Sequence, residues 1–373
     1  MNKSHRFGVE VEFEGLPVPR ARKVVRAYFG SDFDHLGRTW AIVRDASVRG
    51  GFELVTPPIY YADLFILQEL VKRLRQAGAR RSPTTGLHVH LAAGDLSLEQ
   101  TKSLVNLYAS HAVLVYSMFN ARPMRRVLFC QPLLPFAEAL EHEEPQTFDE
   151  LKQLWYRVFD SNGEQGSRSN TSRYVELNLN SYFYRGTIEL RAFSSTNHAG
   201  RVRSMVLLAL ALIDKAKTYP GVYPLAKEHK PQSREEALRR TNDLLDILGL
   251  IGPEYRIVRE HLRSSVAEHY VGYNSGSTTL LEFTGLGMVF EAHSYGALLD
   301  QMWDNEFFSL DPARQFLAGI RKRGKTPKAK HRYQRLLASA ARYEYYSRRL
   351  IRLLASAGLG ALQTGSQLAS ADG

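Results

Sequence analysis

The stretch Gly8-Val9-Glu10-Val11-Glu12-Phe13-Glu14-Gly15 alternates apolar and acidic residues with a period of two. A β-strand with this pattern places its three glutamates on one face and its apolar side chains in a core on the other. Three carboxylates in line repel one another unless water or a cation lies between them. Taken alone, the pattern favours a solvated sheet edge. It gains functional meaning because the chain repeats it.

The same spacing of polar residues at positions i and i+2 occurs in segments far apart in the sequence. Three such pairs stand between apolar residues, and a further two acidic residues flank a turn: Glu10/Glu12, His88/His90, Glu189/Arg191, and Asp45 with Glu53. If these segments join one sheet, its polar face collects carboxylates, imidazoles and a guanidinium. Such side chains coordinate divalent cations and phosphates, and the mixed oxygen and nitrogen set suits Mg²⁺ or Mn²⁺ better than zinc.

The order of elements predicts an α+β fold with an antiparallel sheet. Residues 1–60 are predicted to form strands and turns, including a strand over 38–45, and residues 61–77 a helix. A strand follows at 86–91, and a long helix begins at Asp95 or Ser97 and includes Val115. A hairpin is predicted from segments 174–179 and 187–193, followed by a helix that Ser195, Thr196 or Asn197 caps. Residues 233–268 and most of 289–357 are predicted to be helical. We therefore expect a catalytic domain over residues 1–217 and a mainly helical region over 218–373.

Composition indicates an ordinary globular protein, with 44% hydrophobic and 23% charged residues. No apolar run approaches the roughly 18 residues that span a bilayer, and the N-terminus shows no signal peptide. Cys130 is the sole cysteine, which favours a reducing compartment and a buried, unreactive thiol. These features predict a cytoplasmic protein without a membrane partner.

The positive charge is concentrated near the C-terminus. Residues 321–352 hold twelve Lys or Arg side chains and one acidic residue, Glu344, which accounts for the whole net charge of +11. Two interpretations stay open: a solvated helix face, or a surface for an anionic partner such as nucleic acid or an acidic protein or peptide.

Four blocks resemble the amidoligase family, which belongs to the glutamine synthetase and glutamate–cysteine ligase superfamily of carboxylate–amine ligases. The blocks lie in the family's order and spacing across residues 6–215. They are Gly8-Val9-Glu10-Val11-Glu12, Trp40…Asp45-Ala46-Ser47…Glu53-Leu54-Val55-Thr56-Pro57, Gly86-Leu87-His88-Val89-His90, and Thr187-Ile188-Glu189-Leu190-Arg191…Thr196. The chain departs from the family at Asp45-Ala46-Ser47, where Asp-Gly-Ser is usual, and at Thr56-Pro57, where Ser-Pro is common.

The resemblance implies a curved antiparallel sheet with helices on its convex face and a concave face that binds ATP and Mg²⁺ or Mn²⁺. It implies metal ligands on the acidic, His and Glu-x-Arg strands; we assign Glu10, Glu12, Glu53, His90 and Glu189, with His88 as the alternative to His90. His88, Ser47 and Arg191 would contact ATP, and Arg191 would stabilise the transferring phosphoryl group. Glu14 is left out of the ligand set because Gly15-Leu16-Pro17 ends its strand.

The expected reaction joins a carboxylate to an amine through an acyl phosphate made with ATP. Asp45 or Glu14 is a candidate base for the amine. No Walker A motif is present, so metal and sheet side chains would bind the phosphates. Two other classes stay open: a metal-dependent hydrolase using the same carboxylate and His face, and a non-catalytic nucleic-acid-binding protein that uses residues 321–352. The sequence identifies neither the carboxylate nor the amine, which can be a small molecule, a peptide or a protein.

Overall fold

The computed structural model describes residues 2–30, 34–35, 37–45, 51–82, 85–119, 129–159, 164–226, 231, 233–269, 279–283 and 288–292. The chain forms two compact units, Met1–Gly272 and Tyr273–Gly373. In the second unit, the described residues form the strands β9 (Thr279–Phe283) and β10 (Met288–Ala292), which pair antiparallel. The domain boundary at residue 217 stays a prediction.

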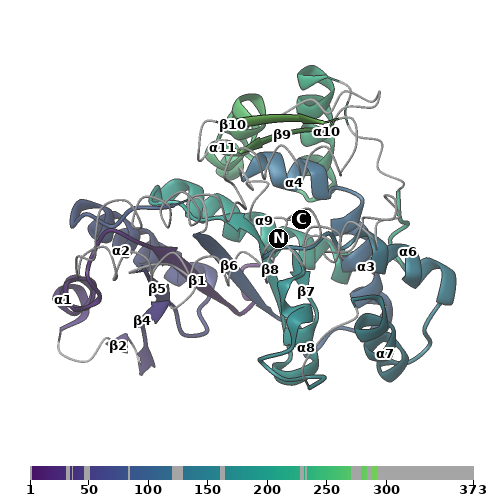
Figure 1. The fold of residues 1–373 in the computed structure, drawn as a ribbon, viewed down its shortest axis with the longest axis horizontal. Coiled ribbons are helices and arrows are strands. Elements are labelled where there is room, and N and C mark those ends of the chain that lie inside the picture. Colours follow the sequence, from purple (N-terminus) through teal and green to yellow (C-terminus); the bar gives the residue numbers. More distant parts are fainter. Residues whose placement is uncertain are drawn as a thin grey trace, which may run out of the picture. The chain divides into compact units, whose positions relative to one another are not determined.

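One six-stranded antiparallel sheet, in the order β4-β5-β1-β6-β8-β7, organises the first unit (Figure 1). Its strands are β1 (Phe7–Phe13), β4 (Ala41–Asp45), β5 (Gly51–Val55), β6 (Gly86–Ala92), β7 (Leu177–Asn178) and β8 (Thr187–Ser194). The acidic strand β1 lies between β5 and β6, so it is not a solvated edge. The prediction of an α+β fold with an antiparallel sheet is confirmed.

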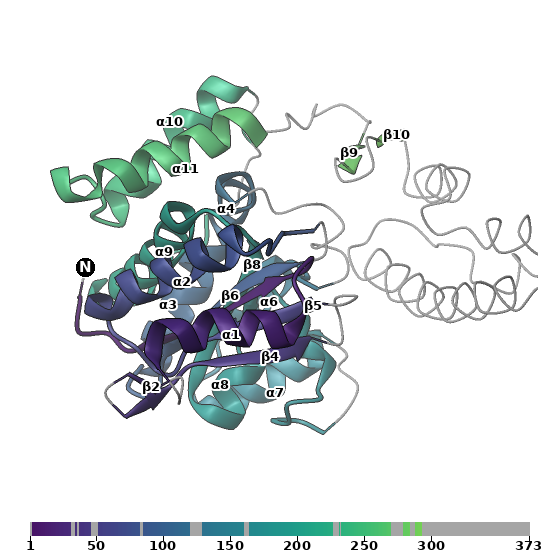
Figure 2. The same cartoon turned by 90° about the vertical axis from the view of Figure 1, so that its left-hand side faces the viewer.

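The alternation in β1 separates an apolar face from a polar one. Val9, Val11 and Phe13 are almost completely buried. Helix α9 (Ala199–Thr218) packs on β6, and α2 (Leu64–Gln76) and α3 (Leu98–Ala109) pack on α9. Figure 2 shows these three helices together on one side of the sheet. The curvature of the sheet and its likeness to a glutamine synthetase domain stay predictions.

Helix α1 (Val18–Phe29) corrects the prediction that residues 1–60 hold only strands and turns. Pro17 is its N-cap residue and Pro19 lies in its first turn, where a missing backbone N–H costs nothing. Ala21 and Val25 are fully buried, so packing stabilises this short helix. The predicted strand 38–45 is also interrupted: β2 (Asp34–His35) pairs with β3 (Arg38–Thr39), and β4 starts after Trp40.

The long helix predicted to begin at Asp95 or Ser97 is two helices. Ser97 is the cap, because its hydroxyl accepts a hydrogen bond from the backbone N–H of Gln100. Helix α3 ends at Ala109, and α4 (Ala112–Met118) follows. Two features separate them: the Ser110 hydroxyl accepts a hydrogen bond from the backbone N–H of Ala226, and His111 has a non-helical φ of −128°.

The predicted hairpin pairs as expected but is built differently. Leu177 lies opposite Leu190 and Asn178 opposite Glu189, yet β7 has only two residues. The 3-10 helix η2 (Thr171–Tyr174) precedes it, and helix α8 (Asn180–Arg185) takes the place of a turn. Gly186 ends α8 with a φ of +71°, which glycine adopts without strain.

The residues predicted to cap α9, which are Ser195, Thr196 and Asn197, do not cap it. His198 is the cap residue, and its Nδ1 accepts a hydrogen bond from the backbone N–H of Arg201 at 3.2 Å. The three predicted capping residues precede it, and two already have other partners: Ser195 donates to the backbone oxygen of Glu12, and Thr196 accepts from the backbone N–H of His198.

The remaining described elements of the first unit are helices. They are η1 (Tyr61–Asp63), α6 (Leu134–Glu143), α7 (Phe148–Val158), α10 (Arg234–Ile247), η3 (Pro253–Tyr255) and α11 (Arg256–His269). Helices α10 and α11 confirm the prediction for 233–268. Residues 289–292 belong to strand β10 instead of a helix, and the rest of the segment 289–357 predicted to be mainly helical, with the basic segment 321–352, lies outside the described residues.

Candidate active site

Three neighbouring strands, β1, β6 and β8, position the candidate site. In the antiparallel register Glu10 lies opposite His88, and His90 lies opposite Glu189. Directly opposed residues of antiparallel strands project from the same face. The polar pairs that the sequence places on separate strands therefore meet on one face of the sheet. A register shift between Leu87 and Val89 contributes to this alignment of β6 and β8.

Glu10 contacts both histidines of β6. Its Oε2 lies 3.2 Å from Nδ1 of His88, and its Oε1 lies 3.2 Å from Nε2 of His90. Burial raises the pKa of Glu10, but the hydrogen bonds with His88 and His90 outweigh burial and hold the pKa well below its usual range. Glu10 is therefore ionised in the folded protein.

The Glu189 carboxylate accepts hydrogen bonds from two side chains. Nη1 of Arg191 donates to its Oε1 at 2.5 Å, and Nδ2 of Asn178 donates to its Oε2 at 2.7 Å. Burial opposes ionisation, but Arg191, followed by His90 and His88, lowers the pKa of Glu189 to about 2. Burial also opposes the charge of Arg191, yet Glu189 raises the pKa of Arg191 above its usual value. The two residues form a buried ion pair.

Glu12 links the cluster by hydrogen bonds to the first residue of β6 and to the residue that follows β8. Its Oε2 accepts a hydrogen bond from the backbone N–H of Gly86 at 2.5 Å, and its Oε1 lies 3.5 Å from Nε2 of His88. Its backbone oxygen accepts from the Ser195 hydroxyl at 2.6 Å. Glu12 therefore has a structural role besides any role as a ligand.

The ligand atoms of three residues are close enough to share one cation. Glu10, His88 and Glu189 each offer one atom, and these atoms lie within 4.8 Å of one another. Two oxygen ligands on opposite sides of Mg²⁺ are about 4.2 Å apart, so small side-chain movements suffice. Burial, followed by the charge of Arg191, lowers the pKa of His88, which favours the neutral imidazole that binds metals. The donor set fits Mg²⁺ or Mn²⁺.

Glu53, Asp45 and Ser47 are the remaining predicted site residues. Glu53 is half-buried on β5, directly opposite Glu12 in the register. Asp45 is the last residue of β4 and pairs with Gly51, but its side chain lies outside the described part of the structure, as does all of Ser47. Both histidines contact Glu10, so His90 as metal ligand and His88 as ATP contact stay predictions.

The structure adds residues that sequence reasoning did not place in the site. Asn178 holds Glu189, Nη2 of Arg185 lies 2.7 Å from Nδ1 of His90, and the Arg191 guanidinium lies over the Tyr174 ring, 5.6 Å from its centroid. Glu176, Asn178 and Asn180 alternate along the sequence, which is compatible with an extension of the polar face or with an exposed hairpin. All three residues are buried, so the exposed hairpin is wrong.

Cys130 lies directly behind this site. The residue is fully buried, as predicted, and its thiol donates a hydrogen bond to the backbone oxygen of Arg191, with Sγ 3.1 Å from that oxygen. The thiol thus holds the strand that carries Arg191.

The fold and this cluster define an α+β protein with carboxylates, imidazoles and an arginine gathered on one sheet face. Residues 3–213 match the family model described as "Putative amidoligase enzyme". The match covers more than half of the chain, and the protein belongs to this family.

Comparison with solved structures gives a more distant similarity. A bifunctional glutathione synthetase from Pasteurella multocida aligns with 71% of this chain, at 12% sequence identity and a TM-score of 0.38. The aligned part covers 49% of that protein, so the chain spans about half of its length. No curated protein sequence matches the chain. In the described residues, no helix has the length and apolar character needed to cross a membrane.

Proposed function

We propose that this protein is an ATP- and divalent-metal-dependent ligase that forms an amide bond between a carboxylate and an amine. The observation that carries the proposal is the convergence of Glu10, His88, Glu189 and Arg191 on one face of the sheet, in a chain that belongs to the amidoligase family. The match to the amidoligase family favours the ligase over a metal-dependent hydrolase, which could use the same carboxylate and His face.

Glu10, His88 and Glu189 would hold a divalent cation, with Glu12, Glu53 and His90 as further candidates for a second ion. The cation, when bound, would neutralise the phosphate charges of ATP and polarise the transferring phosphoryl group. Whichever of His88 and His90 does not hold the cation is, with Ser47, the proposed nucleotide contact, and Asp45 is the proposed base for the amine.

Arg191 would stabilise the negative charge that develops on the phosphoryl oxygens. Its pairing with Glu189 and its position over the Tyr174 ring fix the plane of the guanidinium beside the ligand cluster. A planar, permanently charged fork can keep one donor on Glu189 while presenting others to a phosphoryl oxygen. Burial strengthens this interaction because little water screens it.

In the proposed reaction, a carboxylate oxygen attacks the γ-phosphorus of ATP, and ADP leaves. The nitrogen of the amine then attacks the acyl carbon, phosphate leaves, and the amine loses a proton to the base. The substrates are a carboxylate and an amine carried by a small molecule, a peptide or a protein. An acidic partner or nucleic acid at residues 321–352 is a separate proposal from the sequence.

Hydroxylamine trapping tests this function without knowledge of the natural amine. The full chain is incubated with ATP, Mg²⁺, hydroxylamine and a panel of amino acids and short peptides, and hydroxamate and ADP are measured. We expect both products to require ATP and a carboxylate. Glu10→Gln should abolish them, whereas Glu99→Gln, at an exposed position in the first turn of α3, should retain them. Hydrolysis of amides in nucleotide-free buffer, with no hydroxamate from any panel member, would overturn the proposal.

A further inference from the structure

Arg185, the last residue of helix α8, places a guanidinium at the edge of the carboxylate cluster. Its Nη2 lies 2.7 Å from Nδ1 of His90, and Nε2 of His90 lies 3.2 Å from Oε1 of Glu10. Because α8 takes the place of a turn between β7 and β8, Arg185 lies just before the strand that carries Glu189. One imidazole therefore separates Arg185 from a proposed ligand of the cation.

Three side chains fix the direction of the Arg185 guanidinium. Its Nε donates to Oγ of Ser181 at 2.9 Å and to Oγ1 of Thr187 at 3.2 Å. A guanidinium can only donate hydrogen bonds, so Nδ1 of His90 is the acceptor of the hydrogen bond from Nη2. A side chain that is already held in this way loses little conformational entropy when it binds a ligand.

The charge of Arg185 has no carboxylate partner within the described part of the chain. Its hydrogen-bond partners there are two hydroxyls and an imidazole, and the residue is exposed. The N–H groups that these hydrogen bonds do not use are available to an anion. Because a guanidinium is always charged and presents its donors as a planar fork, it suits an oxyanion such as a phosphate.

Arg191, in the same cluster, has the opposite environment. It is almost completely buried, and its charge is compensated by Glu189, to which its Nη1 donates. Arg185 is exposed, and so is part of the Glu10 side chain. A substrate that arrives from solvent therefore meets Arg185 and Glu10 before it meets Arg191.

The neighbours of Arg185 indicate which substrate group it meets. The residues whose ligand atoms can share one cation are Glu10, His88 and Glu189, which leaves His90 as the proposed nucleotide contact. Arg185 donates to His90 and so lies beside the proposed nucleotide contact. The phosphate chain of ATP is also the most highly charged part of the proposed substrates, so an uncompensated guanidinium stabilises it most.

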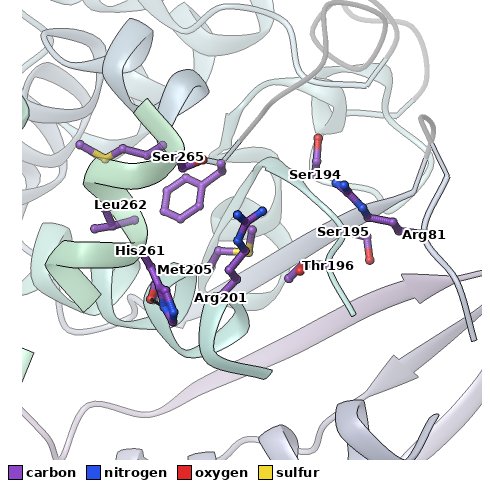
Figure 3. Close-up of a pocket in the computed structure, with 12 residues that line it drawn as sticks. Arg81, Ser194, Ser195, Thr196, Arg201, Met205, His261, Leu262 and Ser265 are labelled. Atoms are coloured by element: carbon purple, nitrogen blue, oxygen red, sulfur yellow. Dashed lines mark hydrogen bonds between the residues drawn. The ribbon is translucent and has the colours of Figure 1, made fainter. Parts of the chain in front are cut away.

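Two further arginines line a pocket at the other end of β8, and they offer a comparison. Figure 3 shows Arg81 beside Ser194, the last residue of β8, with Arg201 nearby. This pocket has room for only about one or two water molecules, so it holds no nucleotide. Arg81 is exposed, like Arg185, and its replacement is a matched control for the loss of one positive charge.

We propose that Arg185 binds the β- or γ-phosphate of ATP through the N–H groups that Ser181, Thr187 and His90 leave unused. This proposal rests on the proposed function, because it assigns Arg185 to the nucleotide of the same reaction. Arg185 would neutralise phosphate charge from the solvent side of the cluster, and Arg191 from the buried side. The two arginines then have separate roles, because only Arg185 can contact the nucleotide before the substrate is enclosed.

Calorimetric titration of the full chain tests this contact without turnover. The probes are the non-hydrolysable ATP analogue AMPPNP, ADP and AMP, each with Mg²⁺. Arg185→Gln should weaken binding of AMPPNP by about tenfold or more, since it removes charge-assisted hydrogen bonds. It should leave the affinity for AMP unchanged, because AMP has neither phosphate. Binding of ADP shows which phosphate is contacted: it weakens equally for the β-phosphate and stays unchanged for the γ-phosphate.

A second measurement separates direct contact from an effect through His90. Mn²⁺ binding without nucleotide, followed by electron paramagnetic resonance, should be as tight in Arg185→Gln as in the wild type or tighter. Removing a nearby positive charge does not weaken the binding of a cation. Arg185→Lys, which keeps the charge without the fork, should have an affinity for AMPPNP between those of Arg185→Gln and the wild type. Arg81→Gln should match the wild type throughout, and thermal melting establishes that each variant is folded.

The outcomes separate this proposal from the proposed function. Full affinity for AMPPNP in Arg185→Gln, or no binding of AMPPNP by the wild type, would overturn the phosphate contact. Equal weakening of AMP and AMPPNP, or a parallel loss of Mn²⁺ binding, would do the same, because Arg185 would then act through the structure of the site. Hydroxamate formation with full AMPPNP affinity in Arg185→Gln would remove this proposal alone. Binding of AMPPNP that depends on Arg185, without hydroxamate from any panel member, would remove the proposed function alone.

Discussion

Glu10 and His88 face each other across β1 and β6, with Oε2 of Glu10 3.2 Å from Nδ1 of His88. The carboxylate is partly accessible, with 24% of its side chain exposed, whereas the imidazole is 3% exposed. This difference means that solvent, and any ligand, reaches the pair from the side of Glu10. The two residues should therefore differ in how their substitution affects stability and function.

The two glutamates of β1 should respond differently to amidation. Glu10→Gln should abolish turnover and lower the free energy of unfolding less than Glu12→Gln does, because 24% of the Glu10 side chain is exposed and only 7% of the Glu12 side chain. Glu12→Gln should lower that free energy by about 1.5–3 kcal/mol, since Glu12 accepts a buried hydrogen bond from the Gly86 N–H that its charge strengthens. Urea denaturation of both variants measures this difference. Equal stability of the two would contradict the structural role assigned to Glu12.

Arg191→Lys should reduce turnover by about 10²–10³-fold if Arg191 stabilises the transferring phosphoryl group. Lysine keeps the charge but lacks the planar fork that pairs with Glu189 and lies over the Tyr174 ring. Hydroxamate formation under saturating ATP is the measurement. Arg157→Lys, at an exposed ion pair with Glu143 on α7 and α6, is the control and should keep full activity. Full activity in Arg191→Lys would remove the assigned role.

Asn178→Ala should weaken divalent-metal binding by about 10–100-fold, because Asn178 orients Glu189 through a 2.7 Å hydrogen bond. Mn²⁺ binding followed by electron paramagnetic resonance measures the effect directly. Asn106→Ala is a matched control: its buried amide donates to the backbone oxygen of Tyr223, away from the cluster. If the two variants bind Mn²⁺ equally well, Asn178 has no part in positioning a metal ligand.

His111 should make the protein less stable in mild acid. Burial, with a smaller effect of Arg240, lowers the pKa of His111 to about 4. Neither ring nitrogen has a hydrogen-bond partner among the residues that the structure describes. Between the ordinary pKa of about 6.5 and this value, the unfolded chain binds a proton that the folded chain does not, so stability falls as the pH falls through this window.

From pH 8 to pH 5 the loss from His111 should be about 2 kcal/mol. Urea denaturation at both pH values should show a loss smaller by this amount in His111→Gln. The variant of the exposed His142 on α6, His142→Gln, controls for the removal of one imidazole. An unchanged loss in His111→Gln would mean that other groups cause the acid sensitivity.

The alternating residues predicted the strands β1, β6 and β8 and the face that each presents, because alternation is a local property of a strand. The contact of Asn178 with Glu189 could not be predicted in this way. It depends on the register in which the two residues of β7 pair with β8, which the alternation of Glu176, Asn178 and Asn180 does not give. The alignment of His90 with Glu189 likewise depends on a register shift between β6 and β8, with the extra residue on β8, that no local pattern encodes.

Helix α1 shows the same limit of local reasoning. Pro17 and Pro19 next to Gly15 are typical of a turn, and the helix is stabilised by burying Ala21 and Val25 against the rest of the unit. The break between α3 and α4 also has a distant cause, the hydrogen bond from Ala226 to Ser110. These elements are decided by tertiary contacts, whereas the polar strands are decided by their own sequence.

The hydrogen bonds of Glu12 also bear on how the chain is made. They join Glu12 to Gly86, 74 residues later, and to Ser195, 183 residues later. At the usual speed of synthesis, Ser195 follows Glu12 by roughly 10 to 40 s. The neighbours of the acidic strand, β5 and β6, are complete by residue 92, whereas β8 follows about 100 residues later, and contacts of such long range fold slowly. The polar face is therefore complete only after β8 has been made, and a chain that stops before β8 lacks Glu189 and Arg191.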